Sequence, residues 1–291
     1  MQNQNTTKNN KIKLSSNFLM GVVEINVKNL QLQKNFYNKS LNLDIIDENS
    51  QKVVLGNNNK PLLILHREDS LSQSQAGDAG LYHFAVVYSS RGDLARTVYR
   101  ILKDESHYFT GSADHLVSEA FYFSDPEGNG IELYYDRDQD TWKWENGRVQ
   151  MAALYIDPEE YISRYIVLEE KNTETKIGHI HLKVGDIERA KEFYVYTLGF
   201  EITAEMPQAL FISVGGYHHH IGMNTWESYG ATERNESHGL KIFEFIFSDI
   251  REIESVKERL NDNHIHYSED KKSVEFEDPW KNKIRIVYSS I

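Results

Sequence analysis

Two stretches of the sequence decide the fold: GVVEINVKNLQLQKNFYNKSLNLDI, residues 21–45, and GHIHLKVGDIERAKEFYVYTLGFEI, residues 178–202. They align without a gap, and the offset from Gly21 to Gly178 is 157 residues. Phe36 and Tyr37 of the first stretch recur as Phe193 and Tyr194 of the second. Such a repeat indicates that the chain contains copies of one supersecondary unit.

A second pair of segments extends the repeat. GLYHFAV, residues 80–86, resembles GLKIFEF, residues 239–245, and FSDPEGNGIELYY, residues 123–135, resembles FEDPWKNKIRIVY, residues 276–288. The separations are similar to the first offset. The sequence therefore predicts four modules, over residues 19–68, 79–137, 177–228 and 238–291.

Each module reads as one strand, one helix and three further strands. Residues 179–184 alternate between apolar and polar, which is typical of a half-buried strand. Asp186 is placed to cap a helix, and Gly199 to end it. The segments ALFISV and HHHIGM then predict strands, and a DPEGNG-type turn precedes the last strand of modules two and four. The fold class is α+β, built from βαβββ units.

The segments outside the modules are a tail and a connection. Residues 1–17 are expected to form a disordered tail, since Met1 to Lys13 are rich in Asn and Gln. Residues 138–176 join the two module pairs, and a short helix is expected there with Asp157 as its cap and Pro158 in its first turn.

Composition limits the function. The 291 residues include no cysteine, so disulfides and thiolate ligands are excluded. The formal net charge of −12 disfavours nucleic acid and anionic membranes as partners. The sequence shows no apolar run of membrane-spanning length and no signal-peptide core, so a soluble cytoplasmic protein is expected.

The repeated segments resemble those of the vicinal-oxygen-chelate superfamily, which includes glyoxalases, fosfomycin-resistance proteins and extradiol dioxygenases. GLYHFAV and GGYHHHIGMNTW, residues 215–226, are most similar to catechol 2,3-dioxygenase-like proteins of bacteria. The resemblance covers almost the whole chain after the tail. It implies modules paired into half-barrels. It also implies a metal held by a His of a first strand and a Glu of a last strand.

The ligand positions that the resemblance implies are filled only in modules two and three. Module two supplies His83 and Glu132, and module three supplies His179. Two imidazoles and one carboxylate form the facial triad of non-haem Fe(II) sites. Fe(II) is therefore the expected cofactor, with Zn, Mn or Ni as alternatives. The corresponding positions of the other modules hold Val22, Ile242 and Arg285.

These ligands also predict how the modules pair. All donors must reach one ion, so modules two and three should share one half-barrel, and modules one and four should form a metal-free counterpart. Completion of the site across a homo-oligomer is an alternative arrangement.

The run His218–His220 is a second feature. In a regular strand His218 and His220 would share one face, and His219 would lie on the other. His220 falls where the resemblance places a further ligand in glyoxalases. A neutral imidazole there would be an acid–base group, with His218 lining the same cavity.

Three other side chains are candidates. Tyr122 stands ten residues before Glu132, a spacing that resembles the substrate-binding tyrosine of ring-cleaving dioxygenases. His115, in the preceding loop, is a candidate acid–base group on the substrate side. His181 shares a face with His179, but we expect it to be a core residue.

Three function hypotheses follow. The first is an extradiol dioxygenase that takes dioxygen and a small aromatic substrate of catechol or hydroquinone type. The second is a redox-neutral lyase, isomerase or transferase in which Zn, Ni or Mn acts as a Lewis acid. The third is a metal-free ligand-binding protein similar to bleomycin-resistance proteins. The retained donors favour the first two hypotheses over the third.

Overall fold

A computed structural model describes residue 14, residues 17–167 and residues 174–289 of the chain. The expected tail, residues 1–17, lies almost entirely outside the described residues.

The described residues form the four expected modules. Module one contains β1 (Leu19–Val27), α1 (Leu30–Lys39), β2 (Asp44–Glu48), β3 (Lys52–Asn57) and β4 (Lys60–Arg67). Module two contains β5 (Gly80–Tyr88), α2 (Arg91–Glu105), a 3₁₀ turn at Ser106–Tyr108, β6 (Phe109–Asp114), β7 (Ser118–Ser124) and β8 (Gly130–Asp136). Module three contains β11 (Thr175–Lys183), α4 (Ile187–Lys191), a π-helical turn at Glu192–Thr197, β12 (Glu201–Met206), β13 (Ala209–Ser213) and β14 (Ile221–Asn224). Module four contains β15 (Gly239–Phe247), α5 (Ile250–Asp262), β16 (Tyr267–Glu269), β17 (Ser273–Glu277) and β18 (Lys283–Tyr288).

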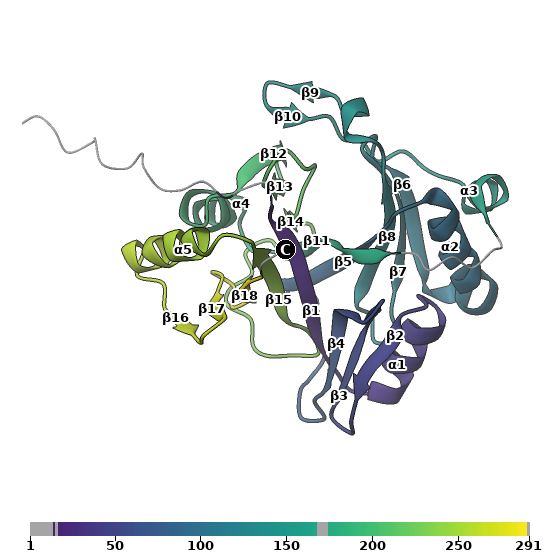
Figure 1. Cartoon of the computed structure of the whole chain (residues 1–291), viewed down its shortest axis with the longest axis horizontal. Helices are drawn as coiled ribbons and strands as arrows, with labels where there is room; N and C mark the ends of the chain where they lie inside the picture. The colour runs from purple at the N-terminus through teal and green to yellow at the C-terminus, as the bar shows by residue number, and fades with distance from the viewer. Residues whose placement is uncertain (1–13, 15–16, 168–173, 290–291) are drawn as a thin grey trace, which may run out of the picture.

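The modules pair as the ligand argument predicts. One eight-stranded sheet has the order β12-β13-β14-β11-β5-β8-β7-β6, so it joins modules three and two (Figure 1). The other has the order β16-β17-β18-β15-β1-β4-β3-β2 and joins modules four and one. In every module the first strand runs parallel to the last, and the two modules meet through antiparallel first strands. We call these the 2/3 sheet and the 1/4 sheet.

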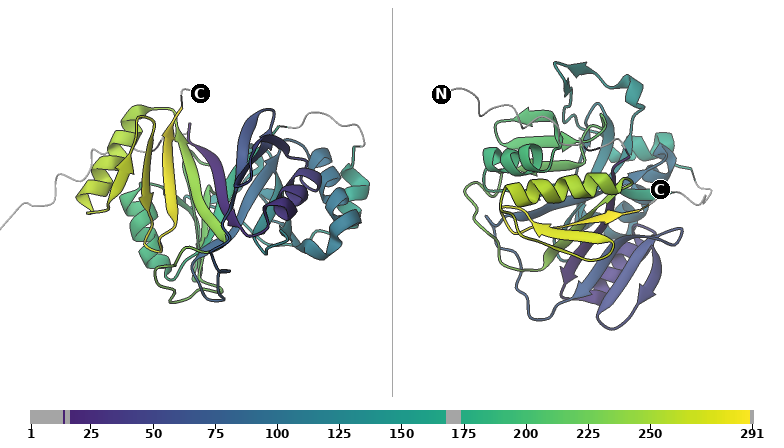
Figure 2. Two further views of the ribbon diagram at one scale, coloured as in Figure 1. Left: turned by 90° about the horizontal axis from the view of Figure 1, so that it is seen from below. Right: turned by 60° about the vertical axis from the view of Figure 1, so that its left-hand side comes forward.

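Both sheets share one continuous hydrophobic core. Helices α1 and α2 lie together at one end of the molecule, and α4 and α5 at the other (Figure 2). The repeated tyrosines stabilise this arrangement. The hydroxyl of Tyr37 donates to Asp125 at 2.8 Å, and that of Tyr194 donates to Asp278 at 2.9 Å. Each bond connects the helix of one sheet with a turn of the other sheet.

The connecting segment contains a hairpin that the sequence did not predict, formed by β9 (Trp144–Glu145) and β10 (Arg148–Val149). It stands at the top of Figure 1 between the two edges of the 2/3 sheet. Arg148 donates to the carbonyl of Ile202 on one edge, and residues 114 and 154 form a bridge at the other. The connecting segment that contains this hairpin thus contacts both edges of the 2/3 sheet.

The expected short helix is α3 (Pro158–Tyr165), and Asp157 caps it by accepting from the backbone N–H groups of residues 159 and 160. No helix in the described part of the chain is long and apolar enough to cross a membrane.

Module three departs from the sequence expectation in one place. The strand expected over HHHIGM begins only at Ile221. Gly215 and Gly216 have φ angles of +68° and +78° and form a turn before it. Residues 217–220 are irregular, so the strict alternation expected for His218–His220 is wrong.

Candidate metal centre

Three neighbouring strands in the centre of the 2/3 sheet carry the expected ligands. His83 lies on β5, Glu132 on β8 and His179 on β11. Glu132 and His179 are both register partners of Ala85, on the strand between them. Because Ala85 has only a methyl side chain, the larger donors on either side can converge above it.

The donor atoms fit a metal ion. One ligand atom from each of the three residues lies within 4.8 Å of the others. The Nε2 atoms of His83 and His179 are 2.9 Å and 3.1 Å from the same carboxylate oxygen of Glu132. Nevertheless, Nε2 of His83 is buried without a properly angled hydrogen bond. His179 Nε2 forms a hydrogen bond with this oxygen, so the three donors converge on one carboxylate oxygen while Nε2 of His83 remains available for a metal ion. No other group of three such donors occurs among the described residues.

The charge states also suit a divalent metal. Burial raises the pKa of the Glu132 carboxyl, but His179 and His83 outweigh burial and hold that pKa well below its usual range. Burial lowers the pKa of His179. An ionised Glu132 carboxylate and a neutral His179 imidazole are the forms in which these two side chains bind metal.

Tyr122 and His115 form a hydrogen-bonded pair beside this triad. Nδ1 of His115 is 2.7 Å from the carbonyl of Ala152, which can only accept, so Nδ1 carries the proton. In this tautomer Nε2 accepts from the Tyr122 hydroxyl at 2.6 Å. The Tyr122 ring lies 5.6 Å from that of His83. Burial, together with the charge of Glu132, raises the pKa of Tyr122 well above its usual value, so the phenol stays protonated.

His181 is buried next to the triad. Its Nε2 accepts from the Asn224 amide at 3.0 Å, and its ring lies 4.9 Å from that of His83. Burial lowers its pKa well below the usual range. These contacts agree with the core position expected for it.

Of the three consecutive histidines, His219 lies closest to the triad. Its ring centroid is 4.2 Å from that of His179, whereas that of His218 is 6.2 Å away. His218 is thus farther from the triad than His219, and the Nδ1 atoms of the two rings are 2.8 Å apart. Burial lowers the pKa of His219 well below its usual value.

His220 lies in other surroundings than those expected. Its Nδ1 accepts from the Val214 N–H at 3.3 Å, and its ring packs against Phe18 with centroids 4.7 Å apart. Burial lowers its pKa to about 3. These contacts do not support the expected acid–base role, because the Nδ1 lone pair is occupied and the ring packs on Phe18.

Sequence reasoning therefore missed two groups near the triad. His219 was assigned to the opposite face. The sequence analysis does not identify Asp136, which forms a 2.8 Å hydrogen bond with His218. The pair Gly215–Gly216 was the available signal for His219, since two glycines interrupt a strand and reset its phase. For Asp136 the signal was its spacing on β8, two and four residues from Tyr134 and Glu132.

The 1/4 sheet carries ion pairs where the 2/3 sheet carries metal-type donors. Arg285 takes the position of Glu132, and its guanidinium binds Glu24 and Glu275, each at 2.6 Å. Glu24 also lies 2.6 Å from Nε2 of His66. A guanidinium therefore occupies this half-barrel, and the described residues show no second metal-type cluster.

Aromatic side chains line one side of the triad. Tyr82 lies 5.4 Å from His83 and 5.5 Å from Trp226, measured between ring centroids. Phe211 packs against His181 and His219 at 5.7 Å and 5.1 Å. Trp226 is about half exposed, so this rim connects the buried donors with the surface.

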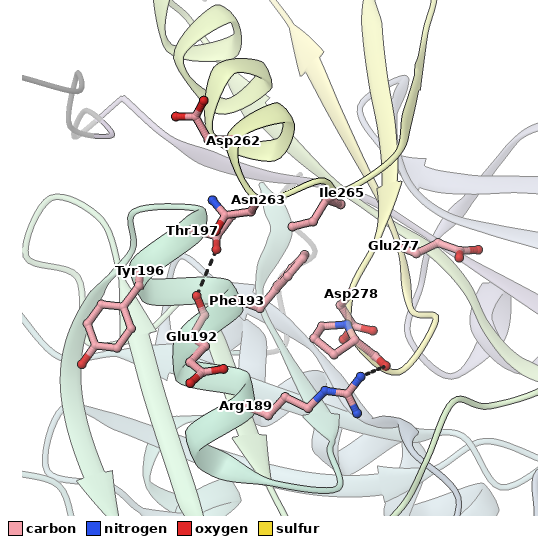
Figure 3. A pocket seen from close by; sticks show the side chains of 11 residues that line it. Arg189, Glu192, Phe193, Tyr196, Thr197, Asp262, Asn263, Ile265, Glu277 and Asp278 are labelled. Carbon is pink, nitrogen blue, oxygen red and sulfur yellow. Dashed lines mark hydrogen bonds between the residues drawn. The ribbon is translucent and has the colours of Figure 1, made fainter. Parts of the chain in front are cut away.

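A separate cavity of about 740 Å³ lies between the π-helical turn and the end of α5 (Figure 3). Arg189 there donates to the carbonyl of Pro279, and Thr197 donates to that of Glu192. The residues that line this cavity include no histidine, so it is distinct from the metal centre.

Paired βαβββ modules with two imidazoles and one carboxylate at the centre of one sheet define a half-barrel protein with a metal-type donor set. The model of the Glyoxalase/Bleomycin resistance protein/Dioxygenase superfamily matches residues 19–133 and 176–286, and the chain belongs to this superfamily.

Individual proteins similar to this chain are consistent with its membership of the superfamily. The chain is 32% identical over 270 residues to a catechol-2,3-dioxygenase of Bacillus subtilis (strain 168), covering 89% of this chain and 93% of the relative. A putative dioxygenase structure from Bacillus subtilis superposes with a TM-score of 0.61 at 13% identity, covering 95% of this chain and 86% of that one. Glyoxalase I from Zea mays superposes with a TM-score of 0.56 at 14% identity, covering 93% and 92%. The two structural likenesses show the fold alone.

Proposed function

We propose that this protein is an extradiol ring-cleaving dioxygenase that binds one Fe(II) through His83, Glu132 and His179 and opens a catechol- or hydroquinone-type ring. The observation that carries the proposal is the convergence of two imidazoles and a single carboxylate on one point of the 2/3 sheet. This donor set is typical of non-haem Fe(II) oxygenases. The 32% identity to a catechol-2,3-dioxygenase supports the same activity.

Held by His83, Glu132 and His179, Fe(II) would supply open coordination positions for the substrate and dioxygen and would transfer electrons between them. The overall reaction adds both atoms of one dioxygen molecule to one ring and breaks one ring carbon–carbon bond.

The protein side chains would bind the substrate and move its protons. The Tyr122 hydroxyl, oriented by His115, lies beside the triad and would hydrogen-bond a diol oxygen. His219 would accept a proton from the diol and return it later as a general acid. Tyr82, Phe211 and Trp226 would pack against the ring, as aromatic walls do in small-molecule sites.

Metal content and oxygen uptake test this proposal. The protein is purified anaerobically, loaded with Fe(II), and mixed with a panel of catechols and hydroquinones in air-saturated buffer. We expect one Fe(II) per chain, one dioxygen consumed per ring and a yellow ring-opened product. The matched variants are His179→Ala and His107→Ala, the latter at an exposed surface histidine.

His179→Ala should weaken metal binding more than about 100-fold, beyond the effect of losing an outer-shell partner, while His107→Ala should leave it unchanged. Tight Fe(II) binding without oxygen uptake across the panel would contradict ring cleavage and favour a Lewis-acid enzyme that uses Zn, Ni or Mn. Unchanged metal affinity in His179→Ala would contradict the site itself.

A further inference from the structure

A chain of hydrogen bonds leads from the C-terminal end of β8 to His219, which lies beside the metal centre. Glu132, Tyr134 and Asp136 alternate along β8, so they share one face. Asp136 is at the outer end, with about a quarter of its side chain exposed. One of its carboxylate oxygens lies 2.8 Å from Nε2 of His218, and Nδ1 of His218 lies 2.8 Å from Nδ1 of His219.

The donors and acceptors in this chain determine where the protons lie. A carboxylate only accepts, so Nε2 of His218 carries a proton and donates it to Asp136. In the neutral form of His218, Nδ1 is then an acceptor, and it must receive the proton on Nδ1 of His219. Nε2 of His219 is therefore left with its lone pair. The same ring packs on the ligand His179 at 4.2 Å.

A second set of contacts holds Asp136 in place. The Tyr217 hydroxyl donates to its other carboxylate oxygen at 2.8 Å, and the Tyr134 hydroxyl lies 2.7 Å from that of Tyr217. The Trp142 ring packs on His218 with centroids 5.2 Å apart. His218 is fully buried between these groups, so a simple surface ion pair does not explain the arrangement.

We propose that Asp136, acting through His218, is a positioning residue that sets the tautomer and ring orientation of His219, so that Nε2 of His219 presents its lone pair to a ligand at the metal centre. Only the identity of the proton that His219 accepts rests on the proposed function; the tautomer does not.

Nitrogen-15 NMR of the histidine rings tests the tautomer without any turnover. The protein is measured metal-free and loaded with diamagnetic Zn(II), and the His219 signals are assigned by comparison with His219→Gln. We expect Nε2 of His219 to show the pyridine-like signal of an unprotonated nitrogen. In Asp136→Ala this signal should shift toward the protonated form, whereas the matched change Asp138→Ala, at an exposed carboxylate, should leave it in place.

His218→Phe provides a second test that preserves ring volume and packing against Trp142. In this variant Nδ1 of His219 has no acceptor from residue 218. The tautomer of His219 should therefore shift as it does in Asp136→Ala. A protonated Nε2 in the unmodified protein, or an unchanged His219 signal in both variants, would overturn the proposal.

Kinetics with an active substrate provide a further readout. Asp136→Ala should lower kcat by roughly 10²–10⁴ with little change in KM or metal content, as expected when a general base loses its orienting partner. The double variant Asp136→Ala/His219→Gln should be no slower than His219→Gln alone, since residues that act as one unit are non-additive. Additive effects would mean that Asp136 acts independently of His219.

The two proposals fail in different ways. Absence of turnover in the unmodified protein, with the expected tautomer, would refute ring cleavage and leave the positioning role intact. Full turnover in Asp136→Ala, with an unchanged His219 signal, would refute the positioning role alone.

Discussion

At the scale of single residues, His219 and His220 are neighbours in the chain with different surroundings. His219 packs on His179, whereas His220 packs on Phe18 and accepts from a backbone N–H. One position is suited to chemistry and the other to packing.

Alanine at each position should separate these roles. His219→Ala should keep the metal and lower turnover by roughly 10²–10⁴, because a general base is lost. His220→Ala should leave kcat nearly unchanged and lower the free energy of unfolding by about 2–3 kcal/mol, because it leaves a cavity. Metal analysis, steady-state kinetics and urea unfolding distinguish the two outcomes. The reverse pattern would restore His220 as the catalytic group.

Tyr122 allows a finer test of the substrate side of the site. Tyr122→Phe removes only the hydroxyl that donates to His115 and would bind a diol oxygen. We expect kcat/KM to fall about tenfold, since one hydrogen bond contributes roughly 1–1.5 kcal/mol, with metal content unchanged. Tyr99→Phe, at an exposed tyrosine on α2, is the control. Equal activity of the two variants would exclude Tyr122 from substrate binding.

At the scale of the elements, equivalent strands of the two sheets carry different side chains. The 2/3 sheet has metal-type donors where the 1/4 sheet has ion pairs. Glu24 on β1 occupies the place that His181 has on β11. Burial raises the pKa of the Glu24 carboxyl, but hydrogen bonds with His66 and Arg285 outweigh burial and lower it from 4.5 to about 2. Ion pairs thus compensate the buried Glu24 carboxylate of the 1/4 sheet without a metal.

This shift predicts the acid stability of the protein. A carboxyl with a depressed pKa stabilises the fold above its unfolded value of about 4.5, and this contribution is lost as the pH falls toward 2. Lowering this pKa from 4.5 to about 2 corresponds to at most about 3–4 kcal/mol of stability. Urea unfolding between pH 7 and pH 2.5 should show a steeper loss of stability for the unmodified protein than for Glu24→Gln. Parallel curves would contradict a stabilising role for this carboxylate.

At the scale of the whole molecule, each half of the chain contributes four strands to each sheet. The antiparallel pairs β1–β15 and β5–β11 join the halves, and the metal-type donors are divided between them: His83 and Glu132 come from one half and His179 from the other. Neither half alone can complete a half-barrel or the triad.

Cutting the chain between Val167 and Glu174 tests this interdependence. Each half alone exposes the unpaired edges of β1 and β5, or of β11 and β15, so we expect aggregation or self-association. Co-expressed halves should form one complex that binds one metal ion per pair. Size-exclusion chromatography and metal analysis provide the measurement. A monomeric N-terminal half with undiminished metal affinity would show that His179 is not required.

The repeat made much of this architecture predictable. Identical residues such as Tyr37 and Tyr194 recur at a constant offset, so module number and order follow from local patterns alone. The resemblance to the vicinal-oxygen-chelate superfamily indicates the ligand positions, and only modules two and three fill them, with His83, Glu132 and His179. Even the pairing of modules two and three follows, because donors for one ion must converge.

The surroundings of the site depended on tertiary structure. Strand alternation holds only in regular backbone, and the turn at Gly215–Gly216 brought His219, not His220, against His179. Asp136 and His218 are separated by 82 residues, and only the curl of the sheet brings them within hydrogen-bonding distance. Local sequence determines which elements form, whereas contacts between distant residues determine which histidine faces the metal centre and which carboxylate orients it.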